Sequence, residues 1–108
     1  MVIEQFNVYL IDLDPTTGSE MKKTRPCVII SPNELNRKLS TVIVAPLTSV
    51  IRHYPCRLIC KFQKISGEIV LDQMRALDKT RLIKRLGSLD EYGDEILKVI
   101  NQIFDKGH

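Results

Sequence analysis

The stretch DLDPTTGSEMKKTRPCVIISPN, residues Asp12 to Asn33, decides the fold of this chain. It joins two apolar runs through a polar loop that contains a glycine, an acid, two lysines and an arginine. We interpret it as a strand, a functional loop and a second strand. Because the residue before a proline is pushed into extended geometry, Arg25, which precedes Pro26, should enter the second strand with its backbone direction fixed. A guanidinium held in this way suits the recognition of phosphate or carboxylate.

The apolar runs on the two sides of this loop predict the first two strands. Val8 to Leu13 is nearly continuous in apolar residues and ends at Asp14, which predicts a buried strand. Cys27 to Ile30 is wholly apolar and predicts a strand that is buried on both faces. The loop between them, about ten residues from Pro15 to Thr24, is longer than the usual connection of roughly 4–6 residues. Loops of this length often carry function.

A third strand is predicted from Thr41 to Leu47. Pro46 lies near its end and predicts a strand edge or a bulge there, because proline cannot donate a hydrogen bond to a neighbouring strand. A bend at this proline would turn the hydroxyls of Thr48 and Ser49 outward at the strand terminus, where a site could use them.

The rest of the chain predicts shorter strands and one helix. Strands are expected at Arg57–Phe62, across residues 68–78 with a break at Asp72 and Gln73, and within Lys79–Leu89, with a corner at Ile65–Gly67. Ser88 and Glu91 fit a capping box, with Asp90 as an alternative N-cap. Apolar residues then recur at helical spacing at Tyr92, Ile96, Val99, Ile100 and Ile103, which predicts an amphipathic helix from Asp90 to about Phe104.

These elements predict a mainly β (α+β) fold, a small curled antiparallel sheet or barrel that the terminal helix closes. With 108 residues, the chain is long enough for one core and too short for two, so we expect a single domain over residues 1–108. The formal net charge of +3 permits an anionic partner.

Cysteine usage and hydropathy limit the class of protein further. The three cysteines have no CxxC spacing and lie among apolar or strand-forming neighbours, so we expect buried thiols and no metal site. This usage fits the reducing cytoplasm. The apolar runs are far shorter than the ~20 residues that a membrane span requires.

The residues with possible chemistry gather in the loop and at the end of the third strand. The candidates are Glu20, Lys22, Lys23, Arg25, Thr48 and Ser49. Both histidines, His53 and His108, are poor candidates for a general base, since the first falls in a predicted turn and the second ends the sequence. Phosphodiester chemistry without histidine or metal would need a cationic side chain to stabilise the phosphorane, with hydroxyl or carboxylate helpers.

Each of these residues also has a structural interpretation. The two loop lysines can be solvated charges, and Arg25 can belong to a structural ion pair. Thr48 and Ser49 can be simple hydroxyls at a strand end. Asp72 and Gln73 can satisfy backbone groups at a bend. The residues alone therefore predict a basic, mostly β domain with a possible anion site.

The ordered set of short motifs resembles a known family across nearly the whole chain. The matching segments are Asp12–Thr16, Gly18–Glu20, Arg25–Pro26 leading into Val28–Pro32, Pro46–Ser49, Tyr54–Pro55, Asp72–Arg75 and Leu77–Asp78. Their order and spacing resemble the MazF/PemK (Kid)-type toxins of bacterial type II toxin–antitoxin systems.

This resemblance implies an SH3-like or CcdB-like β-barrel with a C-terminal helix and a homodimeric endoribonuclease. Such an enzyme cuts single-stranded RNA at specific sequences, without metal or cofactor, and a cognate acidic antitoxin inhibits it. The resemblance implies Arg25 and Thr48 as the catalytic pair, with attack by the 2′-hydroxyl of the RNA itself. Further residues are implied to bind RNA or to line the site: Glu20, Lys22, Lys23, Ser49, Asp72, Gln73 and Arg75.

Two alternatives belong to other functional classes. A CcdB-like toxin that poisons gyrase by binding would share the fold, but its hallmark is a tryptophan near the C-terminus, and this chain has no tryptophan. The other alternative is an inactive homologue that only binds RNA or an antitoxin. The presence of both Arg25 and Thr48 argues against it.

Overall fold

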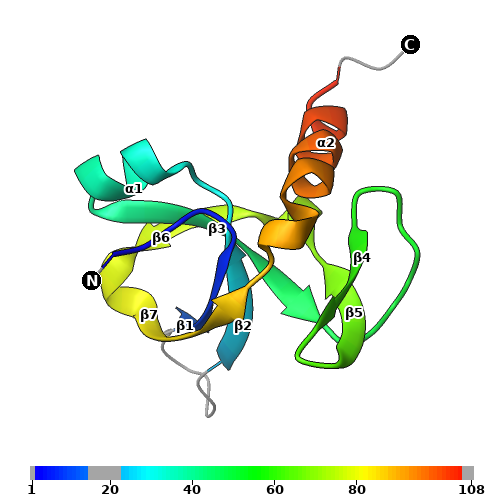
Figure 1. Cartoon of the computed structure of the whole chain (residues 1–108), viewed down its shortest axis with the longest axis horizontal. Coiled ribbons are helices and arrows are strands. Elements are labelled where there is room, and N and C mark those ends of the chain that lie inside the picture. The colour runs from blue at the N-terminus through cyan, green and yellow to red at the C-terminus, as the bar shows by residue number, and fades with distance from the viewer. Residues whose placement is uncertain (1, 15–22, 106–108) are drawn as a thin grey trace.

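The computed structural model of the chain describes residues 2–14 and 23–105. In these residues the chain forms strands, two α-helices and three short 3₁₀ helices (Figure 1). The strands are β1 (Asn7–Asp14), β2 (Lys23–Ile29), β3 (Thr41–Thr48), β4 (Leu58–Phe62), β5 (Ile65–Ile69), β6 (Arg75–Asp78) and β7 (Leu82–Ser88). The α-helices are α1 (Asn33–Lys38) and α2 (Gly93–Ile103), and the 3₁₀ helices span Leu71–Gln73, Lys79–Arg81 and Asp90–Tyr92.

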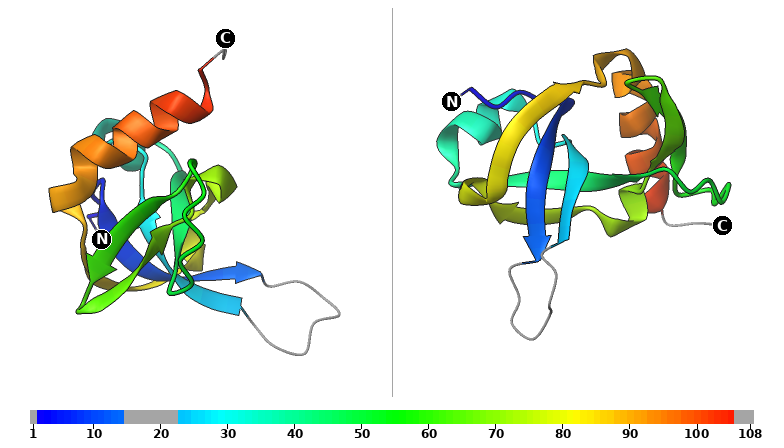
Figure 2. Two further views of the ribbon diagram at one scale, coloured as in Figure 1. Left: turned by 90° about the vertical axis from the view of Figure 1, so that its right-hand side faces the viewer. Right: turned by 90° about the horizontal axis from the view of Figure 1, so that it is seen from below.

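The strands form one curled antiparallel sheet in the order β4-β5-β3-β2-β1-β7, and β6 pairs with β3. The sheet curls into a half-barrel, and α2 packs on it between α1 and the β4–β5 hairpin (Figures 1 and 2). The predicted fold class, mainly β with a C-terminal helix, is therefore confirmed. The break predicted at Asp72 and Gln73 is confirmed as well, because a 3₁₀ helix there separates β5 from β6.

The apolar runs of β1 and β2 are continuous because both faces of these strands are buried. Neighbouring side chains of a strand point to opposite faces, and here each face has its own core. Tyr9, Ile11, Cys27 and Ile29 belong to the core inside the half-barrel. Val8 and Val28 belong to the core beneath α2. The predicted burial of Cys27–Ile30 on both faces is thus confirmed.

The predicted amphipathic helix is present, but its start differs from the prediction. Ile96 is fully buried, and its apolar helix neighbours pack on the same core. The capping box of Ser88 and Glu91 is wrong, and so is the alternative cap at Asp90. The chain first makes a 3₁₀ turn, so α2 begins only at Gly93 with Tyr92 as an N-cap that makes no side-chain bond.

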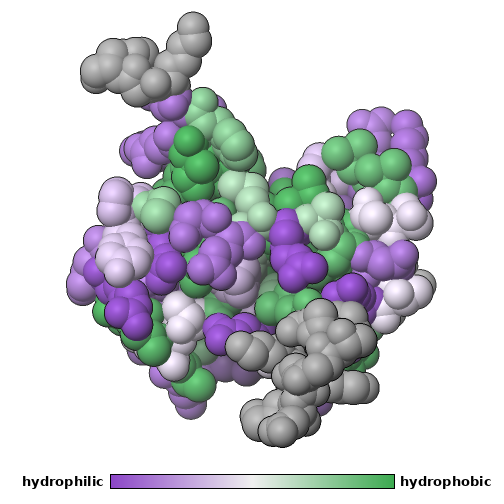
Figure 3. Space-filling model, turned by 180° about the vertical axis from the view of Figure 1, so that it is seen from behind, coloured by the Kyte–Doolittle hydropathy of each residue, from purple (hydrophilic) through white to green (hydrophobic). Residues whose placement is uncertain are grey.

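The other face of α2 carries apolar side chains that no described residue covers. Leu97 is 45% exposed and Phe104, directly after the helix, is 73% exposed. Seen from behind, apolar surface gathers over this helix (Figure 3).

Pro46 lies inside the sheet and not at its edge. It pairs with Cys27 of β2 on one side, and on the other its carbonyl accepts a hydrogen bond from the Val70 N–H. The missing N–H of proline is tolerated because β3 changes partner here. It pairs with β6 as far as Val44 and with β5 from Leu47 onward. The edge prediction is therefore wrong, although the proline does mark an interruption in the pairing.

The corner predicted at Ile65–Gly67 is wrong as well, because this segment begins β5. The turn falls instead at Gln63 and Lys64, both with positive φ values, of 51° and 69°, as a tight hairpin turn requires. Gly67 serves a different purpose from a turn glycine. A Cβ atom on Gly67 would lie 2.1 Å from the carbonyl oxygen of Thr48, so only glycine lets β5 approach the end of β3 this closely.

We predict that Gly67→Ala lowers the free energy of unfolding by about 3 kcal/mol, because the added methyl group must push β3 and β5 apart. Urea unfolding at a fixed protein concentration measures the loss. Gly87→Ala is the matched control, since its Cβ would meet only the ring of Phe62, at 2.9 Å. This ring can shift, and we expect a loss below about 1 kcal/mol. Equal losses for the two variants would contradict the interpretation of Gly67.

Candidate active site

The register of the sheet brings the two leading candidates together. In the β2–β3 pair, Cys27 lies opposite Pro46 and Val28 opposite Ala45. The same register, continued by two residues, brings Arg25 opposite Thr48. The end of β2 that follows the long loop and the end of β3 therefore form one edge of a common site.

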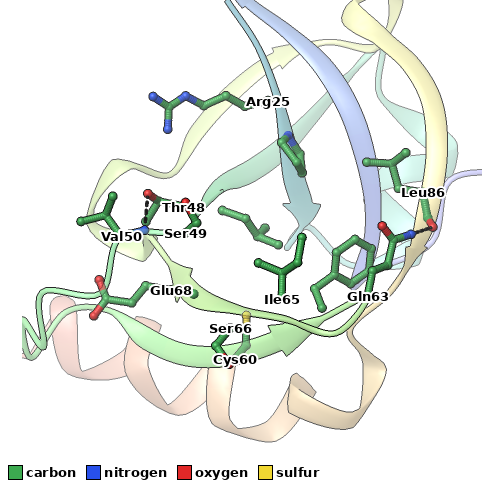
Figure 4. Close-up of a pocket in the computed structure, with 14 residues that line it drawn as sticks. Arg25, Thr48, Ser49, Val50, Cys60, Gln63, Ile65, Ser66, Glu68 and Leu86 are labelled. Atoms are coloured by element: carbon green, nitrogen blue, oxygen red, sulfur yellow. Dashed lines mark hydrogen bonds between the residues drawn. The ribbon is translucent and has the colours of Figure 1, made fainter.

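Arg25 and Thr48 both line a pocket of about 500 Å³ between the end of β3 and the β4–β5 hairpin (Figure 4). Ser49, another predicted site residue, lines it as well. Its remaining walls are mostly apolar, and the other lining residues are Pro26, Leu47, Val50, Cys60, Phe62, Gln63, Ile65, Ser66, Gly67, Glu68 and Leu86. The site thus combines an apolar interior with a polar corner at Arg25 and Thr48.

The hydroxyl of Thr48 is oriented by the backbone. Its Oγ1 accepts a hydrogen bond of 3.1 Å from the N–H of Val50. A hydroxyl has one proton to donate and two lone pairs that can accept. Because the Val50 N–H occupies a lone pair, the Thr48 proton is left to be donated to a bound ligand.

Arg25 provides the positive charge at the same corner. Its side chain is exposed, and within the described residues its guanidinium has no hydrogen-bond or ion-pair partner. In Figure 4 the guanidinium extends over the side of the pocket where Thr48 and Val50 lie. Since no carboxylate of the described residues pairs with it, this guanidinium is available to an anionic ligand, and its planar donors match phosphate oxygens.

Three of the other predicted site residues, Asp72, Gln73 and Arg75, do not line the pocket. Asp72 forms an ion pair with Arg57, with 3.1 Å between Oδ1 and Nε. Burial raises the pKa of Asp72, but hydrogen bonds, chiefly that from Arg57, outweigh this effect and hold the pKa below its ordinary value. Gln73 is exposed. Arg75 is exposed too, and it donates a hydrogen bond of 3.2 Å to the carbonyl oxygen of Leu13 at the end of β1.

Three predicted residues fall in or beside the long loop. Glu20 and Lys22 lie outside the described residues, as does the side chain of Lys23, whose backbone begins β2. Sequence reasoning missed Glu68 and Arg57, a buried acid and the arginine beside it. The sequence contains one indication of a buried acid here, because the charged residue Glu68 directly precedes the apolar run Ile69–Leu71.

Neither a metal-binding cluster nor a membrane-spanning helix is found in the described residues. Residues 2–14 and 23–105 hold no group of three or more His, Cys, Asp or Glu side chains that could bind a metal ion. No helix in the described part of the chain is long and apolar enough to cross a membrane.

Comparison with known proteins identifies the family. The family described as "PemK-like, MazF-like toxin of type II toxin-antitoxin system" matches residues 4–104. This chain belongs to that family. Endoribonuclease MazF of Staphylococcus saprophyticus is 36% identical over 105 residues, which cover 92% of this chain and 85% of the relative. Endoribonuclease EndoA of Bacillus subtilis is 32% identical over 108 residues, covering 94% and 90%.

A solved structure supports the fold of this PemK/MazF-like toxin. The crystal structure of MazE–MazF (Form-II) from Deinococcus radiodurans superposes with a TM-score of 0.81 at 20% identity, and the match covers 99% of each chain.

The cysteines of this toxin do not contribute a reactive thiol to the pocket. Cys60 lines the pocket but is only 4% exposed, and Cys27 is fully buried in the half-barrel core. Burial raises the pKa of the Cys60 thiol to about 11 and that of Cys27 to about 12. Cys56 is half-buried.

We predict that iodoacetamide at about pH 8 alkylates Cys56 at least tenfold faster than Cys27 and Cys60 in the folded protein. Only the thiolate reacts, and a pKa of about 11 leaves roughly a hundredfold less thiolate at this pH than an ordinary thiol has. Mass spectrometry of peptides after timed quenching measures the rates. In urea the three rates should converge. Rapid alkylation of Cys60 in the folded protein would show that the pocket wall opens to solvent.

Proposed function

We propose that this toxin is a sequence-specific endoribonuclease that cleaves single-stranded RNA without a metal ion, by attack of the 2′-hydroxyl of the RNA. The observation that carries the proposal is the shared pocket of Arg25 and Thr48, which pairs a cation with an oriented hydroxyl. The reaction class is supported by relatives that are endoribonucleases by name and 32–36% identical over most of both chains.

The reaction needs no nucleophile from the protein. The 2′-oxygen attacks the adjacent phosphorus and forms a new P–O bond, and the bond from phosphorus to the 5′-oxygen of the next nucleotide breaks. The 2′-hydroxyl loses its proton and the departing 5′-oxygen gains one. The products are a 2′,3′-cyclic phosphate and a 5′-hydroxyl. The protein must therefore stabilise the charge that develops on the two non-bridging phosphate oxygens.

Arg25 and Thr48 divide this task. Arginine stays charged at neutral pH, so Arg25 acts as an electrostatic stabiliser of the phosphorane and not as the base. The Thr48 hydroxyl donates a hydrogen bond to a non-bridging oxygen, because the Val50 N–H already occupies one of its lone pairs. Glu20 is the candidate acceptor for the 2′-hydroxyl proton, and it lies outside the described residues.

The remaining predicted residues have supporting roles in this proposal. Ser49 contacts the RNA from the pocket wall. Lys22, Lys23, Gln73 and Arg75 bind the RNA outside the pocket. Asp72 acts through its ion pair with Arg57.

We also propose the partners that the family relationship suggests. The toxin forms a homodimer and acts in the cytoplasm, where a cognate acidic antitoxin blocks it. The exposed apolar residues over α2 and the edge strands β4 and β7 offer surface for protein partners. Gyrase poisoning, the alternative function, has no support from the Staphylococcus and Bacillus relatives, both of which are named as endoribonucleases.

We predict that Arg25→Ala and Thr48→Val each reduce the rate of RNA cleavage on the order of 10²–10³-fold, because each removes one donor aimed at the developing charge. Valine keeps the shape of threonine without the hydroxyl. The single-turnover rate on a defined RNA measures the loss. Arg37→Ala, which removes an exposed arginine from α1, is the control for net charge and should keep the full rate. If the folded variants kept near-normal rates, the interpretation of Arg25 and Thr48 as the active site would be wrong.

A further inference from the structure

Glu68 is a buried acid directly beside the proposed active site. It lies in β5 opposite Thr48, and its side chain is fully buried. It lines the pocket, but its carboxylate is turned away from Ile65 and the pocket interior (Figure 4). Burial of a carboxylate is costly unless other groups satisfy it, so its partners indicate what it is for.

Most of these partners belong to the segment that connects β3 with β4. One carboxylate oxygen, Oε2, accepts hydrogen bonds from two consecutive backbone N–H groups, those of Arg52 at 3.1 Å and His53 at 2.8 Å. His53 has a positive φ of 60°, a left-handed conformation that is uncommon for residues other than glycine. The two hydrogen bonds to Glu68 stabilise this segment in that conformation.

Arg57, directly before β4, stabilises the other end of this connection. Its Nη1 lies 3.8 Å from the second carboxylate oxygen of Glu68, Oε1, which has no hydrogen-bond partner in the described structure. Its Nε donates to Asp72, and the guanidinium lies 4.9 Å from the centre of the Tyr54 ring. One arginine thus joins β5, the 3₁₀ helix after β5 and the aromatic ring of the segment.

The part of this connection from Val50 to Tyr54 lies beside the pocket. Val50, its first residue, lines the pocket. The side chains of Arg52, His53 and Tyr54 are exposed. Exposed cationic and aromatic side chains next to each other suit single-stranded RNA, because bases stack on aromatic rings and cations attract the phosphates.

We propose that Glu68, together with Arg57, is a positioning residue for RNA binding. It holds Val50–Tyr54 as a rim beside the pocket, and this rim binds a nucleotide that flanks the scissile phosphate. The proposal rests on the ribonuclease function proposed above. Glu68 itself does not touch the RNA. Its loss should therefore weaken substrate binding and relax the choice of cleavage site, while the chemical step at Arg25 and Thr48 continues.

The first test is Glu68→Gln, which keeps the side-chain shape and one oxygen for the two N–H groups but removes the charge that faces Arg57. We expect KM for a defined RNA to rise about tenfold with kcat within about twofold, the signature of lost binding and not of lost chemistry. Mapping the 5′ ends of all products on a long RNA should show additional cleavage sites. A purely structural role would lower the active fraction without changing KM or the cleavage sites.

The second test uses the rim itself, where substitutions leave the core intact. Tyr54→Ala and Arg52→Ala should each raise KM and change the cleavage sites in the same direction. In the Tyr54→Ala background, Glu68→Gln should add less than about twofold, because two residues that act through one element are not additive. Glu34→Gln, at an exposed acid of α1 that pairs with Lys38 on the surface, is the matched control and should behave as wild type.

The outcomes separate this inference from the proposed function. If wild-type protein cuts RNA and Arg25→Ala does not, but both rim variants keep the wild-type KM and cleavage sites, the inference is overturned and the function stands. A loss of kcat without a change of KM in Glu68→Gln also overturns it. If Glu68→Gln does not fold, the two rim variants decide. If wild-type protein cuts no RNA, both proposals fail.

Discussion

Strand β3 carries the constraint on which the site depends, because it has neighbours on both sides and changes one of them. Its register with β2 is fixed by the paired residues around Pro46 and brings Arg25 opposite Thr48. On its other side, β3 pairs with β6 as far as Val44 and with β5 from Leu47 onward. A shift of one residue in this register would move every side chain of β3 to the other face, and the cation and the hydroxyl would no longer share a pocket.

Two consecutive residues of β5 complete what β3 begins. Gly67 lets β5 come close enough to pair with the end of β3, since any side chain would collide with the Thr48 carbonyl. Glu68 then binds the backbone of the segment that follows Thr48. The strand end with the proposed catalytic hydroxyl is therefore held on both sides, and the loop that leaves it has a defined path. Gly67 thus fixes the position of the proposed catalytic hydroxyl, and Glu68 fixes the shape of the rim Val50–Tyr54 beside the pocket.

The sequence predicts the elements whose signal is local. The apolar runs of β1 and β2 and the helical repeat around Ile96 follow from patterns within a few residues, and the structure confirms them. Thr48 and Ser49 could be predicted as site residues because they lie at the end of a strand, close to a proline.

The sequence could not predict features that depend on a distant partner. Ile65–Gly67 has the composition of a turn, but Gly67 is required by Thr48 of another strand. Pro46 would mark an edge by its chemistry alone, yet it sits where β3 exchanges one neighbour for another. The role of Glu68 depends on backbone groups fifteen and sixteen positions earlier in the chain. Asp72 is implied by the family resemblance to bind RNA or to line the site, but its ion pair with Arg57, fifteen positions earlier, could not be predicted from the sequence.

The most direct test of the central claim, that Arg25 and Thr48 assist attack by the RNA's own 2′-hydroxyl, is the chemical identity of the product ends. One RNA should be cleaved with and without EDTA, next to a copy that carries a single 2′-deoxy nucleotide on the 5′ side of the mapped cut. Mass spectrometry should find a 2′,3′-cyclic phosphate and a 5′-hydroxyl in equal yield with and without EDTA, and no cut at the deoxy position. Products with a 5′-phosphate, cleavage of the deoxy copy or loss of activity in EDTA would contradict the mechanism.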